Sequence, residues 1–294
     1  MVGEPAGLER PALVVAMTGF VDAAGAARLA AEHLRSASDP EPVASYDVDQ
    51  LFDYRARRPP MLFVEDHWES YEAPQLRLDM LRDSGGKPFL LLDGPEPDLQ
   101  WERFVAATEQ LIDRLDVRVS VGLNAIPMAV PHTRPLGVTA HASRRELIAD
   151  YQPWLQRVQV PGSAAHLLEY RLGLAGRDAM GFAVHVPHYL TQTDYPAAAV
   201  TLLEAVSQAT GLSLVSEDLR ASAAQVRTAV DKQVAESDEV RGMVEGLEQQ
   251  YDTYVAGRDN NLLATGAGPL PTADELGAEL ERFLAEHNDR GDQP

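Results

Sequence analysis

Cysteine is absent from this 294-residue sequence. Its absence excludes disulfide bonds, a thiolate nucleophile and cysteine-ligated zinc. A chain of this length does not need such cross-links, because it can bury a substantial apolar core without them. The composition is therefore compatible with a protein of a reducing compartment.

Long apolar runs are missing as well. No stretch approaches the roughly 20 predominantly apolar residues of a membrane-spanning helix. The first residues, which include Glu4, Pro5 and Glu9, lack the basic and then apolar order of a secretory signal. We therefore expect a soluble, cytoplasmic protein without a membrane partner.

Basic residues are scarce relative to acidic ones. The sequence has 45 Asp and Glu against 25 Lys and Arg, which gives a formal net charge of −20 at pH 7. The acidic excess is concentrated in residues 39–102 and 217–289. Such a negative field repels nucleic acids and anionic lipids, so we expect no nucleic-acid partner.

Several motifs of catalysis and cofactor binding are also absent. The sequence contains no Gly-x-Gly-x-x-Gly, no Gly-Lys-Ser/Thr, no His-Glu-x-x-His and no Gly-x-Ser-x-Gly. His185 and His188 form a His-x-x-His pair, but no third ligand follows nearby, and zinc sites use three or four protein ligands. We expect no catalytic residue set, no cofactor and no metal.

Apolar runs alternate with helical patterns over about the first 215 residues. Ala12–Met17 is a run of six apolar residues, which is typical of a strand buried on both faces. Further strands are expected at 43–48, 61–64, 75–81, 88–92, 117–123, 158–160 and 180–186, and helices at 23–34, 99–115, 143–151, 164–174 and 195–210. This order predicts an α/β fold, a three-layer α/β/α sandwich with a largely parallel sheet.

The turn Gly19–Gly25 after the first strand has two interpretations. It could hold a phosphate at the N-terminus of the following Ala-rich helix. Asp22 favours the other interpretation, a structural helix cap, because its carboxylate would use the free amides and repel an anion. We expect Asp22 to be a cap.

The pattern changes after Val215. Residues 216–256 show two amphipathic helical stripes, which predict a helical hairpin extension. Residues 257–294 contain a Gly- and Pro-rich linker and a final helix that begins at Thr272. The expected organisation is a sandwich domain at 1–215, the hairpin at 216–256, and the linker with its terminal helix at 257–294.

Two loops that follow strands contain the candidate ligand-binding residues. Pro131–Pro135 supplies His132 as a possible acid or base and Arg134 as a possible anion clamp, and His188 and Tyr189 follow a later strand. Loops at the carboxyl ends of strands are where α/β sheets commonly bind ligands. The alternative is a structural loop in which Arg134 makes an ordinary internal ion pair.

Three segments carry a family resemblance. Gly19-Phe-Val-Asp-Ala-Ala24, Pro131-His-Thr-Arg-Pro135, and Val186-Pro-His-Tyr-Leu190 with Asp194-Tyr-Pro196 resemble the family of the second proteasome assembly chaperone, in its actinobacterial branch. The resemblance spans roughly residues 10–215. It implies a sandwich similar to that of nucleoside phosphorylases, homo-oligomers, and chaperone activity as in eukaryotic and archaeal relatives.

Two features depart from that resemblance. Some relatives dock through a C-terminal hydrophobic-Tyr-x tail, whereas this sequence ends in Arg290-Gly-Asp-Gln-Pro294. The helical segment after Glu217 is not covered by the resemblance.

The leading functional hypothesis is a non-enzymatic, assembly-chaperone-like protein that forms a homo-oligomer. A trimer is the expected oligomer, and another protein complex is the expected partner. The alternative is a nucleoside-phosphorylase-like enzyme or small-ligand binder, with a pocket formed by His132, Arg134, His188 and Tyr189.

Overall fold

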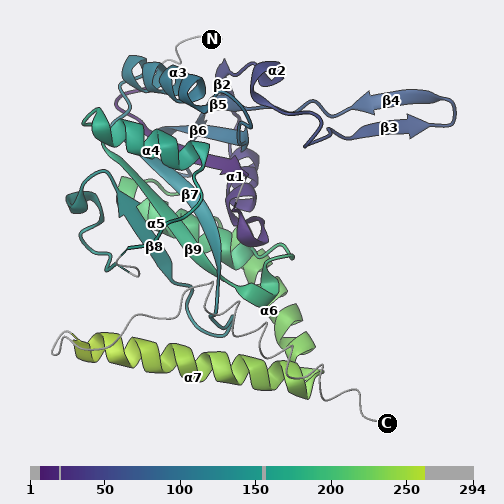
Figure 1. The fold of residues 1–294 in the computed structure, drawn as a ribbon, viewed down its shortest axis with the longest axis vertical. Coiled ribbons are helices and arrows are strands. Elements are labelled where there is room, and N and C mark those ends of the chain that lie inside the picture. The colour runs from purple at the N-terminus through teal and green to yellow at the C-terminus, as the bar shows by residue number, and fades with distance from the viewer. Residues whose placement is uncertain (1–6, 20, 154–156, 262–294) are drawn as a thin grey trace.

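A central sheet lies between two layers of helices (Figure 1). The computed structural model describes residues 7–19, 21–153 and 157–261. Within them, seven strands form the sheet in the order β2-β5-β6-β1-β7-β9-β8, and β3 and β4 form a separate hairpin. The strands are β1 (Ala12–Thr18), β2 (Glu41–Ser45), β3 (Met61–Val64), β4 (His67–Tyr71), β5 (Arg77–Arg82), β6 (Pro88–Pro95), β7 (Val119–Met128), β8 (Val138–Ala142) and β9 (Ala179–Pro187).

The helices connect these strands and extend the chain beyond them. They are α1 (Ala26–Ser36), α2 (Val48–Leu51), α3 (Trp101–Arg114), α4 (Ala164–Leu174), α5 (Pro196–Thr210), α6 (Glu217–Ala235) and α7 (Asp238–Asn261), with 3-10 turns η1 (Ala23–Gly25), η2 (Arg145–Ile148) and η3 (His188–Leu190). None of the helices in the described part of the chain combines the length and apolarity that crossing a membrane requires.

The centre of the sheet is parallel and its margins are antiparallel. Strands β6, β1, β7 and β9 run parallel to one another. β5 is antiparallel to both β2 and β6, and β8 is antiparallel to β9. The predicted α/β/α sandwich with a largely parallel sheet is confirmed.

The first strand contributes to the core on both faces of the sheet. Val14 and Ala16 belong to the apolar cluster that contains residues of α1 and α5, whereas Leu13 and Val15 belong to the cluster that contains residues of α3 and α4. Successive side chains of a strand point to opposite faces, so a strand with helices on both sides needs apolar residues at every position. This requirement explains the continuous apolar run at Ala12–Met17.

Asp22 supports the start of α1 from outside the helix. Its Oδ1 accepts a hydrogen bond from the amide of Ala27 (2.7 Å), and its Oδ2 accepts one from the amide of Arg28 (3.1 Å). The residue just before α1 is Gly25, in the left-handed region at φ 63°. Asp22 therefore reaches across the η1 turn to two amides that the helix leaves without an intrahelical acceptor. Burial is the largest influence on Asp22 and raises its pKa.

Three local expectations differ from the structure. Residues 138–142 form edge strand β8, which was not expected, and residues 143–151 contain the η2 turn instead of a helix. Val158 and Val160 are not in a strand and are 50% and 62% exposed. Neither valine gains the backbone partners or the burial that would favour an extended β conformation there.

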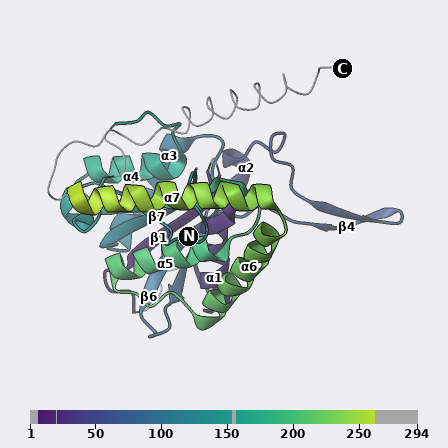
Figure 2. The same cartoon turned by 90° about the horizontal axis from the view of Figure 1, so that it is seen from below.

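The two long C-terminal helices lie on the sandwich. α6 packs against α5, and its residues Leu219 and Val230 are buried in the core cluster on that side. α7 does not run back alongside α6 but crosses near the carboxyl ends of the central strands (Figure 2). The terminal helix expected from Thr272 lies outside the described residues.

We expect Asp22→Ala to lower the free energy of unfolding by about 1 kcal/mol, because two helix amides lose their acceptor. Urea denaturation measures this loss. Asp22→Asn is the control, because its side-chain oxygen can still accept one of the two bonds, and it should lose less stability. An alanine variant as stable as the parent would show that the carboxylate is not a structural cap.

Candidate functional site

His132 and Tyr189, two of the expected pocket residues, contact each other. The Tyr189 hydroxyl accepts a hydrogen bond from the His132 amide (2.8 Å) and lies 2.6 Å from His132 Nδ1. Since that oxygen already accepts one bond, its own proton is available for Nδ1. The other ring nitrogen, Nε2, then carries the proton that it donates to Asp231 of α6 (3.0 Å). Burial raises the pKa of Tyr189 to about 12, so the hydroxyl remains a donor at neutral pH.

Arg134 binds to α7. Its guanidinium makes two hydrogen bonds to the carboxylate of Asp252, both 2.8 Å long, and lies 3.3 Å from Glu248. Thr133 also donates to Glu248, and the Tyr251 hydroxyl donates to the carbonyl of Pro135 (3.0 Å). The loop after β7 is thus joined to α7 by charged and neutral hydrogen bonds.

The four expected residues differ in their surroundings. His132 is only 2% exposed, whereas His188 is exposed at the start of η3. His132 and Arg134 contact the C-terminal helices. These contacts agree with the alternative interpretation, in which the loop is structural and Arg134 makes an internal ion pair. None of the four lines the large cavity of the described structure.

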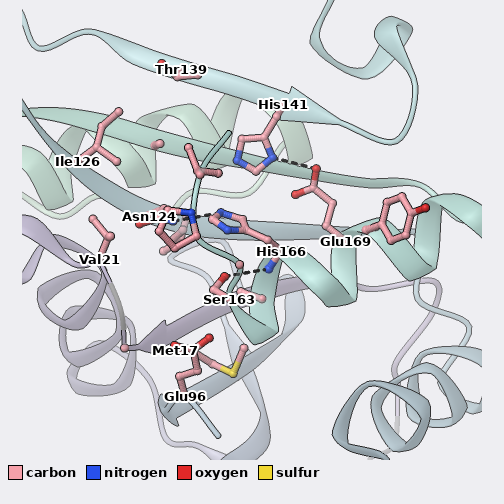
Figure 3. A pocket seen from close by; sticks show the side chains of 18 of the residues that line it. Met17, Val21, Glu96, Asn124, Ile126, Thr139, His141, Ser163, His166 and Glu169 are labelled. Atoms are coloured by element: carbon pink, nitrogen blue, oxygen red, sulfur yellow. Dashed lines mark hydrogen bonds and ion pairs between the residues drawn. The ribbon is translucent and has the colours of Figure 1, made fainter. Parts of the chain in front are cut away.

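That cavity lies on the α4 side of the sheet and has a volume of about 830 Å³. This is within the range of about 300 to 1,000 Å³ typical of small-molecule sites. It is bounded by α4, by the end of β1, the second half of β7 and the middle of β9, by β8, and by the loop before α4 (Figure 3). Its apolar lining includes Met17, Val21, Leu123, Ile126, Val158, Val160 and Leu174.

Asn124 and His166 form the first polar pair of the cavity. Asn124 Oδ1 accepts a hydrogen bond from the amide of Ala125 (2.8 Å), which orients its Nδ2 towards His166 Nε2, 3.2 Å away. Because Nδ2 can only donate, His166 Nε2 accepts and the ring is neutral. Burial, followed by the nearby His141, lowers the pKa of His166 in agreement with this assignment.

His141 and Glu169 form the second polar pair. Nδ1 of His141 on β8 lies 2.8 Å from Oε1 of Glu169 on α4, and the His141 and His166 rings meet edge to face at 5.6 Å (Figure 3). The pair lies over Gly181 of β9, where an added Cβ would be 2.3 Å from the His141 ring. A glycine at this position of β9 is therefore required by the close approach of the imidazole.

Glu96 forms the wall of the cavity at the start of α4. Its Oε1 accepts a hydrogen bond from the amide of Ala164, and Ser163 Oγ accepts one from the amide of His166 (3.1 Å). Gly19 gives Glu96 room, because a Cβ at Gly19 would lie 2.3 Å from Glu96 Oε2. Two of the N-terminal amides of α4, which usually attract anions, are thus already bonded to side-chain oxygens of the protein.

The sequence reasoning missed His141, His166, Glu169 and Glu96. His141 lies on β8, which was not expected, and its partner Glu169 is distant in sequence. His166 and Glu169 are three residues apart on α4, a spacing that places them on one helix face. That spacing was the available signal, although it does not identify which face meets a cavity. Among the described residues, no group of three or more His, Asp or Glu side chains is arranged to hold a metal ion.

The fold and the cavity define an α/β/α sandwich protein with a ligand-sized site at the carboxyl ends of its central strands. The model of the PAC2 family matches residues 16–234, so the chain belongs to the PAC2 family. The family resemblance inferred from the three sequence segments is confirmed. No curated protein sequence gives a significant match.

Several solved structures are similar to this chain. The Mycobacterium tuberculosis protein Rv2714, of unknown function, is 54% identical with a TM-score of 0.83 over 86% of each chain. A Corynebacterium glutamicum protein of unknown function is 40% identical with a TM-score of 0.81, over 86% of this chain and 93% of that chain. The Mycobacterium tuberculosis proteasome-assembly chaperone homologue Rv2125 is 28% identical with a TM-score of 0.73, over 79% and 99% of the two chains.

The buried His185 of β9 predicts a pH-dependent stability. Burial lowers its pKa from 6.5 to about 4, and its Nε2 lies 2.8 Å from the hydroxyl of Thr139, a cavity residue. Between these two pKa values the unfolded chain binds a proton that the folded chain does not. The free energy of unfolding should therefore fall by about 3 kcal/mol as the pH decreases from 6.5 to 4.

Urea denaturation at a series of pH values measures this effect, with His185→Asn as the comparison variant. The asparagine keeps a polar group near Thr139 but does not titrate, so the variant should lose this component of the pH dependence. Equal pH slopes for parent and variant between pH 4 and 6.5 would contradict the assignment.

Proposed function

We propose that this protein binds other proteins in an assembly-chaperone-like role, in the cytoplasm and as a homo-oligomer. Membership of the PAC2 family and similarity to the Mycobacterium tuberculosis proteasome-assembly chaperone homologue support the role. The observation that carries the protein-binding proposal, as binding between copies of this chain, is an exposed apolar hairpin, formed by β3 and β4, which projects from the sandwich (Figures 1 and 2).

The hairpin exposes large apolar side chains on both of its faces. Met61, Leu62, Phe63, Trp68 and Tyr71 are each between 49% and 62% exposed. Leu62 and Phe63 are consecutive in β3 and therefore point to opposite faces. The Phe63 and Trp68 rings pack against each other with their centroids 5.0 Å apart, and this contact leaves both rings largely exposed.

A second copy of the chain is the occupant that best fits the hairpin. An isolated two-stranded hairpin is marginally stable in water, and an exposed apolar patch promotes aggregation. A permanent contact between copies covers the patch whenever the protein is folded, and closed symmetry limits the number of subunits. The family resemblance implies homo-oligomers, and the trimer named among the expectations is one such closed assembly.

If the chain self-associates through the hairpin, a charged residue introduced into the hairpin should prevent the oligomer from forming. In light scattering at micromolar concentration, the parent should have the mass of a multiple of the chain and Phe63→Glu the mass of a single chain. Leu99→Glu is the matched control, because Leu99 is also 50% exposed but lies outside the hairpin. A monomeric parent, or a Phe63→Glu variant with unchanged mass, would refute self-association through this element.

The chaperone role can be tested with purified proteasome α and β subunits from the same organism. Native mass spectrometry should detect a complex between this protein and proteasome subunits, and the yield of complete particles should rise at least twofold. Absence of a complex together with an unchanged yield would exclude proteasome assembly as the task. Phe63→Glu then shows whether the oligomer is needed for the effect.

A small-ligand binder is the second candidate, because the cavity has the volume of a ligand site. Nucleoside phosphorolysis is poorly supported, since the reaction needs a bound phosphate. The described residues of the cavity lining include no Lys or Arg, and Arg134, the expected anion clamp, is paired with Asp252.

A further inference from the structure

The charge of the cavity lining restricts the ligands that it can accept. Two carboxylates, those of Glu96 and Glu169, are among the lining residues, and no Lys or Arg is found among the described residues that line the cavity. The remaining titratable groups of the lining are the His141 and His166 imidazoles and the Tyr170 hydroxyl. An anionic ligand would lose hydration on entry and meet carboxylates, whereas a cation would gain an attractive partner.

The two helix N-termini beside the cavity reinforce this restriction. At the start of α4, Glu96 and Ser163 accept hydrogen bonds from two of the first helix amides. At the start of α1, the carboxylate of Asp22, next to the lining residue Val21, accepts two more. The protein's own side chains thus occupy the positions at which strand-end loops commonly bind phosphate.

Glu169 offers the strongest remaining contact for a ligand. Its Oε1 is bonded to His141, and no other hydrogen bond to this carboxylate is formed among the described residues. Glu169 is held from two sides, by the backbone of α4 and by the His141 ring on β8, so its orientation is set before a ligand enters. A pre-oriented, partly buried carboxylate of this kind favours a charged N–H donor.

The rest of the lining favours an apolar body. Val21, Ile126 and Leu123 lie toward the sheet, and Val158, Val160 and Leu174 line the cavity from the loop before α4 and from α4 itself. An apolar or aromatic group placed among them would remove apolar surface from water at about 25 cal/mol per Å². We propose that this cavity binds a small organic cation, an amine carried on an apolar body, with its nitrogen at the Glu169–His141 pair.

Three probes with the same phenyl group test the charge preference on the full chain. They are 3-phenylpropylamine, 3-phenylpropan-1-ol and 4-phenylbutanoate, measured by calorimetric titration and ligand-observed NMR, with inorganic phosphate as a further anion. The amine should bind at least tenfold more tightly than the alcohol, and the two anions should not bind. Absence of amine binding, or an anion that binds as tightly as the amine, would overturn the proposal.

Two variants locate the amine. Glu169→Gln removes the charge but keeps the shape, and should reduce amine affinity at least tenfold while leaving the alcohol unaffected. Glu245→Gln on the exposed part of α7 is the matched control and should change neither affinity. An undiminished amine affinity in Glu169→Gln would overturn the assignment of the nitrogen to this carboxylate.

Gly181→Ala provides an independent check on the same pair. The added methyl collides with the His141 ring and lies 3.1 Å from Glu169 Oε2, so the pair must move. Amine binding should weaken while circular dichroism and the molecular mass in solution remain those of the parent. If the folded variant binds the amine as well as the parent does, the pair is not the binding point. The proposal does not depend on the chaperone role, because these readouts do not involve a protein partner.

Discussion

The carboxyl edge of the sheet depends on two carboxylates that bond to helix amides. Glu96 holds the start of α4, and Asp22 holds the start of α1. A helix leaves its first four N–H groups without an internal partner, and near a buried strand end they need acceptors from the protein. These acceptors are negatively charged side chains. The same hydrogen bonds therefore anchor the two helices and occupy positions at which an external anion could bind.

The positions of both carboxylates depend on glycines that allow close approach. Gly19 leaves space for Glu96, and Gly25 adopts a left-handed conformation between Asp22 and the helix that it supports. Gly181 likewise leaves space for the His141 ring and for Glu169, which line the cavity. The polar groups of the cavity therefore lie close to the backbone of β1 and β9, and the space above them remains open.

The sequence was sufficient to predict the sandwich but not the cavity. Buried strands such as β1 are recognisable because both faces require apolar side chains, and α5 ends at Gly211 in the left-handed conformation expected of a helix terminus. β8 could not be recognised in the same way. Its residues Val138, Thr139 and His141 are half-buried at the sheet edge. The strand shows no clear alternation of apolar and polar residues.

The four predicted pocket residues illustrate a different limit. The structure brings His132 and Tyr189 into contact, but the partners of His132 and Arg134 come from α6 and α7, which lie much later in the chain. Residue type alone does not distinguish an arginine that binds a ligand from an arginine that makes an internal ion pair. Asp231 and Asp252 lie within the amphipathic segment 216–256, and nothing in their spacing links them to the loop after β7.

The hairpin and the cavity are separate features of the same chain. β3 and β4 project from the β2 and β5 margin of the sheet, whereas the cavity is bounded by β8, β9 and α4 at the opposite margin (Figure 1). A protein bound at the hairpin therefore does not cover the cavity residues His141 and Glu169 of the same subunit. Protein binding and small-molecule binding are consequently not mutually exclusive functions for this fold. An effect of one on the other has a short route that bypasses the central strands, because Arg57, which precedes β3, donates a hydrogen bond to the backbone carbonyl of the cavity-lining residue Glu96.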